Sequence, residues 1–205
     1  MRVQKTTGII LQRYPRGEKD YSVMILSPEY GKIRAYAKGA RRLKSKFTGH
    51  LDLLNIDEFE LYNGPHSTLI TECTVINSFP TFREQLKKFY IATKSAKMTS
   101  RCITENEDHQ QTYDLLLDTL CALNTFDKEE IIYEAFKIKL CNLLGIMPDL
   151  YSLHQTEFEN LSLRLKKVLK FFLEKPYGDI VRLALEQKDS NSLKKTTQQF
   201  LAFSY

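Results

Sequence analysis

Polar and apolar residues alternate with a period of two along the first 80 residues of the chain. Because side chains on a β-strand point alternately to opposite faces, this period indicates strands that are buried on one side. Five short strands with one long interruption before the fourth are typical of a small Greek-key barrel of the OB type, and the pattern also fits an SH3-like barrel or a small open sheet. The predicted strands cover residues 3–13, 21–26, 32–38, 59–62 and 69–76.

After Pro80 the apolar residues recur every three or four positions, which is the period of an amphipathic helix. Thr81 and Glu84 have the spacing of a capping box at the start of the first helix. The third helix is apolar around most of its circumference and is expected at the centre of its domain, with Asp127 as its cap and Gly145 at its end. The predicted helices lie near residues 81–103, 109–125, 127–145, 160–174 and 190–203.

These two patterns predict an α+β protein with two parts. Residues 1–80 are expected to form a five-stranded OB-fold barrel that binds nucleic acid, and residues 81–205 an all-helical domain. An apolar content of 42%, together with only 8 Gly and 6 Pro, is typical of a packed globular protein and excludes low-complexity classes. No apolar run approaches the roughly 18 residues of a membrane span, and the first residues lack a signal-peptide pattern, so a cytosolic protein is expected.

The residue types that most enzyme classes need are missing from the sequence. There is no phosphate-binding glycine loop, no HExxH and no GxSxG, and the four histidines are scattered singly. The acidic pairs lie on opposite strand faces or at helix starts, where structure explains them. A non-enzymatic protein is therefore expected, with a nuclease as the remote enzymatic alternative. The four cysteines form no CxxC pair, so we expect reduced, packed thiols and neither a metal nor a cofactor; they are Cys73, Cys102, Cys121 and Cys141.

Positive charge is concentrated in the first part of the chain. Residues 1–80 carry 12 Lys and Arg against 8 Asp and Glu, a net of +4, out of +5 for the whole chain. No acidic residue occurs between Glu29 and Asp52, whereas seven cations fall between Lys32 and Lys46. A phosphate backbone is the natural complement of such a segment, although a solvated surface is the plainer alternative.

Strand alternation would place Lys32, Arg34, Tyr36 and Lys38 on one face, with three cations around an aromatic ring. That combination suits a single strand of nucleic acid, whose phosphates need cations and whose bases stack on aromatic rings. The loop that follows adds four cations and Phe47, a second stacking candidate that could equally plug the barrel end. The predicted DNA-binding residues are therefore Lys32, Arg34, Tyr36, Lys38, Arg41, Arg42, Lys44, Lys46 and Phe47.

At these residues the sequence resembles the RecO family of bacterial recombination mediators. The similarity is carried by residues 27–42 (SPEYGKIRAYAKGARR), 44–47 (KSKF), 58–62 (EFELY) and 75–80 (VINSFP). It continues at residues 8–11 (GIIL) and 143–150 (LLGIMPDL). The match covers residues 8–80 closely, and the helical part resembles the family mainly in pattern.

The resemblance implies an OB-fold domain, a helical domain and no catalytic centre. It implies binding of single- and double-stranded DNA, annealing of complementary strands and loading of the RecA recombinase onto DNA coated by single-strand-binding protein, together with RecR and in many bacteria RecF. Such a protein is expected in the cytoplasm, associated with the nucleoid. Many members carry a four-cysteine zinc module after the segment matching residues 145–150; because residues 151–160 contain no cysteine, a short form lacking that module is expected.

In the family, the acidic, apolar-ended tail of single-strand-binding protein is expected to dock on the helical domain, where an apolar pocket with a basic rim is needed. Lys166, Lys167 and Lys170 beside Phe171 are the candidates. The alternative from another functional class is an interaction adaptor, whose helical domain docks a partner protein and whose basic loop adds only nonspecific affinity for nucleic acid. RNA binding is a further variant, because OB folds accept either polymer.

Overall fold

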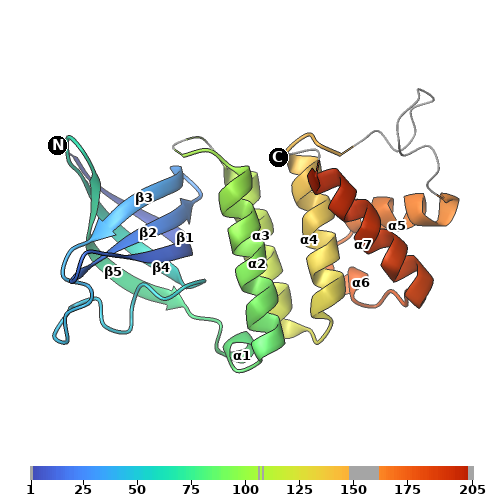
Figure 1. Ribbon diagram of the computed structural model, residues 1–205, viewed down its shortest axis with the longest axis horizontal. Helices are drawn as coiled ribbons and strands as arrows, with labels where there is room; N and C mark the ends of the chain where they lie inside the picture. The colour runs from blue at the N-terminus through green and yellow to red at the C-terminus, as the bar shows by residue number, and fades with distance from the viewer. Residues whose placement is uncertain (1, 106, 108, 148–161, 203–205) are drawn as a thin grey trace.

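The computed structural model describes residues 2–105, 107, 109–147 and 162–202. A β-barrel occupies one end of the elongated molecule and a bundle of helices the other (Figure 1). The predicted absence of a zinc module concerns residues 151–160, which lie outside the described residues. No described helix is long and apolar enough to cross a membrane.

Five strands close into a barrel in the order β1-β2-β3-β5-β4. β3 and β5 pair in parallel, and the other neighbouring strands pair antiparallel. This topology confirms the predicted five-stranded OB-type barrel followed by helices. The strands are β1 (Arg2–Arg16), β2 (Asp20–Ser27), β3 (Gly31–Ala37), β4 (Ile56–Asn63) and β5 (Thr68–Asn77).

β1 closes the barrel because it is long enough to pair with two strands. Its first half pairs with β4 and its second half with β2, and Ile9 has a partner on both. A bulge between Ile10 and Gln12 bends the strand at this changeover. Gly8 lies where β1 passes close to Ile25, since a Cβ there would stand 2.4 Å from Cγ2 of Ile25. Only glycine allows that close approach.

Two hydrophobic cores meet in β1. The first fills the barrel with side chains such as Ile10, Phe59 and Leu61. The second lies between the outer face of the barrel and the helices, and residues such as Leu11 and Leu26 pack into it from the barrel side. The change from strands to helices coincides with the predicted domain division at residue 80, but that division stays a prediction because the second core joins both parts.

α4 is the centre of the helical part, as its all-round apolar pattern predicted. It is buried over most of its length and contacts α2, α3, α5, α6 and α7. Each predicted helical region contains a helix, and the short α6 was not predicted. The helices are α1 (Pro80–Arg83), α2 (Leu86–Cys102), α3 (Gln110–Thr125), α4 (Glu129–Leu143), α5 (Leu163–Glu174), α6 (Tyr177–Ile180) and α7 (Gln187–Ala202).

A helix begins at Pro80, one residue from the predicted start, but the single helix predicted over residues 81–103 is divided in two. Phe79 adopts a left-handed conformation with φ 50°, Pro80 then begins the four-residue α1, and an extended Gln85 separates it from α2. Neither helix has a side-chain cap, so Thr81 and Glu84 form no capping box. The local reason is the Phe79-Pro80 pair, because proline presets the first helical turn before the long apolar stripe begins.

The two ends of α4 differ in how well sequence reasoning anticipated them. Asp127 does not cap the helix. Its carboxylate instead forms an ion pair with the buried ammonium of Lys88 on α2, at an N–O distance of 2.6 Å. Gly145 does end it, with φ 68°, and the Ile146 amide donates to the Cys141 carbonyl at 2.9 Å. This is the hydrogen-bond pattern of a Schellman motif, and it confirms the prediction for Gly145.

The cysteines lie as free thiols on four different elements, β5, α2, α3 and α4. Cys141 is buried, and burial raises the pKa of its thiol to about 11. Cys121 is exposed, so the expectation of a packed thiol is wrong at that position. Among the described residues, no three His, Cys, Asp or Glu side chains are arranged to hold a metal ion.

Candidate nucleic-acid interface

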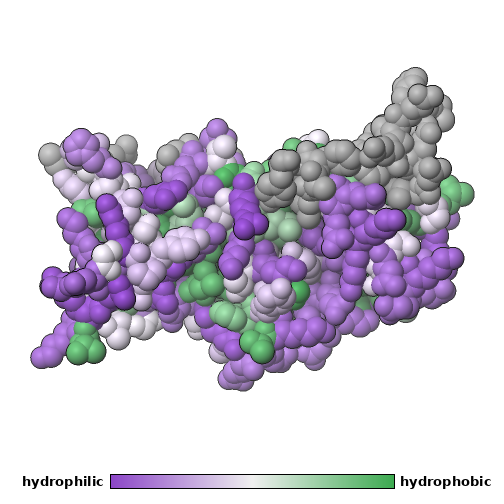
Figure 2. Space-filling view, in the orientation of Figure 1, coloured by the Kyte–Doolittle hydropathy of each residue, from purple (hydrophilic) through white to green (hydrophobic). Residues whose placement is uncertain are grey.

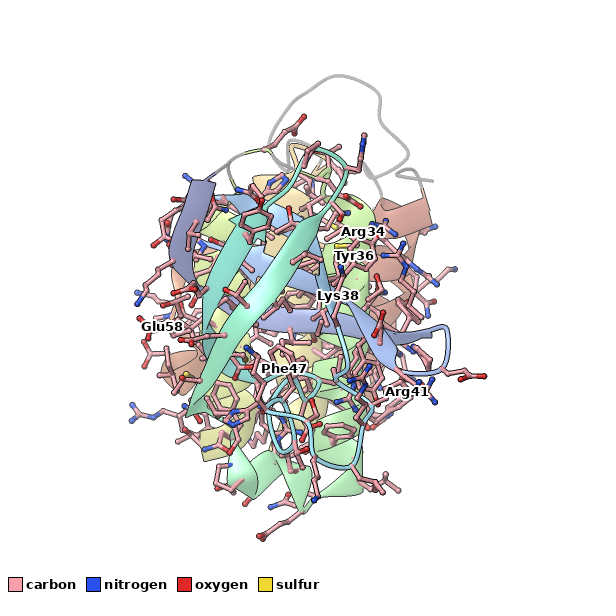
Figure 3. All side chains as sticks on the ribbon, turned by 90° about the vertical axis from the view of Figure 1, so that its left-hand side faces the viewer. Arg34, Tyr36, Lys38, Arg41, Phe47 and Glu58 are labelled. Atoms are coloured by element: carbon pink, nitrogen blue, oxygen red, sulfur yellow. The ribbon has the colours of Figure 1, made fainter. Side chains whose placement is uncertain are left out.

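The alternation predicted for β3 is present. Ile33, Ala35 and Ala37 point into the barrel core. Arg34, Tyr36 and Lys38 lie one after another along the opposite face of the strand, on the outside of the barrel (Figure 3). The strand therefore carries its cations and its ring on the outer surface.

Lys32 is the exception, and its predicted place on the binding surface is wrong. Its side chain is only 8% exposed because α2 covers this end of β3. The ammonium donates to the Ser100 carbonyl at 2.8 Å and to the Ile103 carbonyl, so it satisfies the last carbonyls of α2. Burial lowers the pKa of Lys32. The residue joins the barrel to the helices and is not accessible to a phosphate.

Arg34 is exposed, but its charge is already paired. Its Nη2 and Nε donate to the same carboxylate oxygen of Glu105, at 2.7 Å and 3.2 Å. This hydrogen bond raises the pKa of the Arg34 guanidinium. Glu105 follows the end of α2. A carboxylate of the helical part therefore forms an ion pair with this cation of the barrel.

Tyr36 is half-buried, and the guanidinium carbon of Arg16 lies 3.8 Å from the centre of its ring. The strand register adds a second ring to this face. Tyr14 on β1 pairs with Ser22 on β2, and Ser22 pairs with Tyr36, so the two tyrosines stand two strands apart, or about 10 Å. Tyr14 is 54% exposed. Sequence reasoning missed Tyr14 and Arg16; the signal was the acid-free RYPR run at the end of β1, whose position beside β3 depends on the register.

The loop between β3 and β4 carries the remaining predicted cations. Hydrogen bonds from Arg42 to Gly39, from Ser45 to Arg42 and from Thr48 to Ser45 fold it into successive turns. Arg41 fastens the loop to the β1–β2 turn, since its Nη1 donates to the Gly17 carbonyl at 2.8 Å. All four of the predicted loop cations are exposed, namely Arg41, Arg42, Lys44 and Lys46.

Phe47 does not belong to the exposed surface, and its predicted role as a stacking platform is wrong. The ring is 5% exposed and packs in the barrel core together with Leu51. The alternative, that the ring plugs the end of the barrel, is the arrangement in the structure. The physical reason is that the barrel end below this irregular loop has no helix to close it, so an apolar side chain from the loop fills the opening.

We call the exposed set of cations and rings on this side the barrel face. Asp20 and Asp52 lie near it. Asp52 pairs with Arg13 at 2.9 Å, whereas Asp20 accepts from the Gly39 amide at 2.8 Å, a neutral donor that does not balance its charge. The cations of the face outnumber these acids, so a local excess of positive charge remains. The barrel face consists of Tyr14, Arg16, Tyr36, Lys38, Arg41, Arg42, Lys44 and Lys46, with Arg34 at its edge.

The lysines predicted to bind a partner lie on α5. Lys167 and Lys170 are exposed, Lys166 is half-buried, and Lys170 is 3.6 Å from Glu174. A cavity of about 600 Å³ between α3, α4 and the α5–α6 region is lined by apolar side chains together with two aspartates and Lys139, and by none of these three lysines. In the part of the chain that the structure describes, the three lysines do not line this cavity, and their role stays a prediction.

The pairing of Arg34 with Glu105 leads to a first expected result. Glu105→Gln should raise the affinity for single-stranded DNA about 5-fold at 0.1 M salt, because one phosphate contact contributes about 0.7 to the log–log salt slope. Fluorescence anisotropy measures both quantities. Glu58→Gln is the matched control, since Glu58 is exposed on the opposite side of the barrel in Figure 3. Equal effects of the two variants would show that the gain is a general charge effect and not the release of Arg34.

Comparisons with known proteins add family information to this geometry. The model described as "Recombination protein O N terminal" matches residues 1–79, and the one described as "Recombination protein O C terminal" matches residues 83–160. A curated relative from Dehalococcoides mccartyi (strain CBDB1), named DNA repair protein RecO, is 30% identical over 176 residues, covering 86% of this chain and 68% of the relative.

Two further relatives carry the same name. The protein from Caldanaerobacter subterraneus subsp. tengcongensis is 29% identical over 206 residues, which are 99% of this chain and 80% of the relative. The protein from Roseiflexus sp. (strain RS-1) is 32% identical over 150 residues, which are 73% of this chain. The chain spans 53% of the length of that relative and 59% of the length of the one from Acetivibrio thermocellus.

Proposed function

The chain belongs to the recombination protein O family, and on that premise we propose that it binds single- and double-stranded DNA without catalysis and anneals complementary strands in recombinational repair. The proposed contact surface is the barrel face. Its cations attract the phosphates of either form of DNA, and its two tyrosines favour unpaired bases.

One observation carries this proposal: Tyr14 and Tyr36 stand in one row across β1, β2 and β3, with Arg16 against the second ring. The outer surface of strands 2 and 3 and the adjoining loops is where OB folds bind oligonucleotides. Rings about 10 Å apart among cations can hold bases of one strand while leaving their pairing edges open to solvent. Annealing requires that accessibility, because the second strand must reach those edges.

The proposed role extends to the partners implied by family resemblance. A protein that anneals strands coated by single-strand-binding protein must contact that protein or displace it. We propose that RecA is then loaded onto the DNA from which single-strand-binding protein has been displaced. We propose RecR as a second partner and RecF as a further one. The place of action would be the nucleoid in the cytoplasm, where bacterial DNA is found.

The test is a comparison of Tyr14→Ala and Tyr36→Ala with Tyr30→Ala, which removes an exposed tyrosine from the β2–β3 turn. Each of the first two should lose about 1 to 3 kcal/mol of affinity for single-stranded DNA per base lost, lose less for duplex, and anneal complementary strands more slowly. Anisotropy with labelled single-stranded DNA, duplex DNA and single-stranded RNA, together with an annealing assay, measures these effects.

Three outcomes would contradict the proposal. A parent protein that binds none of the three polymers would fit the adaptor instead. Tighter binding of RNA than of DNA would indicate that RNA is the ligand of the barrel face. Folded tyrosine variants that bind and anneal at the parental level would remove the two rings from the site.

A further inference from the structure

α2 carries a second concentration of positive charge, which the sequence reasoning did not single out. The helix contains five cations and no acid, and no acid occurs anywhere in residues 85–104. One of the five, Lys88, is buried and paired with Asp127, and Lys87 is paired with Glu129 at 2.6 Å. The other three cations are Lys94, Lys97 and Arg101.

These three cations share one face of the helix with an exposed ring. At 3.6 residues per turn, positions 90, 94, 97 and 101 fall within one narrow stripe. Tyr90 is 58% exposed, and the ammonium of Lys94 lies 5.4 Å from the centre of its ring. Lys97 and Arg101 are exposed, and neither has an ion-pair partner among the described residues. We call this stripe the α2 face.

The end of α2 that carries Arg101 is fixed beside the barrel. The Ser100 carbonyl accepts the ammonium of Lys32 from β3, and the Ser100 hydroxyl is 3.4 Å from Oε1 of Gln12 on β1. Arg34 lies two residues beyond Lys32 on β3, and its partner Glu105 follows α2. Arg34 thus lies between the barrel face and the α2 face, with its charge paired with Glu105.

The two figures agree on this arrangement. The side of the barrel with Arg34, Tyr36 and Lys38 is on the right in Figure 3, which is the side nearest the viewer in Figure 1. α2 lies in front of α3 in Figure 1, on that same side. In Figure 2, hydrophilic residues cover much of the barrel and much of the helices on this side, and hydrophobic residues show between the two parts.

We propose that the α2 face is a second nucleic-acid contact, so that a strand held on the barrel face continues across the domain junction and along α2. The proposal rests on the proposed function, because the barrel face supplies the first part of the path. The occupant is a single strand: its phosphates meet Lys97 and Arg101, and one base stacks on Tyr90. From Tyr90 to Arg101 the helix rises about 16 Å, the length of about five stacked nucleotides.

A length series of single-stranded DNA tests this proposal on the whole chain. An oligonucleotide of about 8 nucleotides is within the size of one OB-fold site, whereas one of about 30 reaches α2. Lys97→Gln/Arg101→Gln should weaken binding of the longer oligonucleotide about 25-fold at 0.1 M salt and flatten its salt slope by about 1.4, from two contacts of about 0.7 each. Binding of the shorter one should stay at the parental level.

The matched control is Lys175→Gln/Lys188→Gln, which removes the same charge from exposed positions after α5 and on α7. It should leave both oligonucleotides bound as in the parent, and thermal melts should show all variants folded. The inference is overturned if the α2 variant binds the longer oligonucleotide with parental affinity and slope, which leaves the proposed function intact. If the parent itself binds neither oligonucleotide, the proposed function fails first.

A membrane surface that contains anionic lipid is the other negatively charged partner that a basic helix face could bind. Phosphatidylserine vesicles in a flotation assay separate the two cases. If the α2 variant loses vesicle binding that the parent has and keeps parental DNA binding, the face is a lipid contact and the inference is overturned. If neither protein binds vesicles while the DNA difference is present, the inference is supported.

Discussion

Replacing Phe47 by alanine is expected to lower the free energy of unfolding by about 3 to 5 kcal/mol, which is the usual cost of truncating a buried phenylalanine. The ring is 5% exposed in the barrel core, next to Leu51. Its removal would leave a cavity where the loop closes the barrel. The same loop carries exposed cations of the barrel face, so DNA binding should weaken as the loop loses its anchor.

Chemical denaturation followed by circular dichroism measures this effect. Phe47→Leu should retain most of the stability, because an apolar plug remains. Tyr14→Ala should change the stability by no more than about 0.5 kcal/mol, since more than half of that side chain is exposed. A Phe47→Ala protein with parental stability and reduced affinity for single-stranded DNA would contradict the core role of Phe47 and show that its ring binds DNA.

The second large effect concerns four exposed cations of the barrel face, each without an ion-pair partner among the described residues. Replacing them together by alanine should weaken single-strand binding about 600-fold at 0.1 M salt, from four contacts of about 0.7 each in the log–log salt slope. With about five phosphate contacts, the parental slope on a short oligonucleotide should be roughly −3 to −4, and the variant should retain only the contribution of one contact, about 0.7. The four residues are Lys38, Arg42, Lys44 and Lys46.

A titration at several salt concentrations checks this result. Thermal melts of the variant should match the parent, because the four side chains are exposed. Removing four exposed lysines of the helical part provides the control at equal charge; they are Lys128, Lys175, Lys188 and Lys195. A loss of similar size in both variants would mean that net charge, and not the barrel face, governs binding.

The β3 strand shows how far the sequence alone leads. Its alternation placed Ile33, Ala35 and Ala37 in the core, and they are there. The same alternation grouped Lys32 with Arg34, yet Lys32 is buried under α2 and Arg34 is held by Glu105. The period of a strand reports which face a side chain takes, but not which distant segment covers that face.

Sequence reasoning missed the basic stripe of α2 for a similar reason. The charge count over the helical part hid the basic stripe of α2, because acids elsewhere in that part balance it. The residues on one face of α2 become a surface only when the barrel and α4 cover its other faces. Phe47 is a further case, since an irregular loop has no period from which the direction of a side chain can be derived.

The sequence by itself therefore determined the five strands, the main helices, their apolar faces and the excess of cations in the first part of the chain. These are local properties, because the geometry of a strand or helix relates each residue to its near neighbours. Only the tertiary structure decided that Tyr14 and Arg16 join Tyr36, that Lys32 and Phe47 leave the surface, and that α2 continues the basic side of the barrel. Those relations depend on strand register and on packing between segments tens of residues apart, and local periodicity contains no information about either.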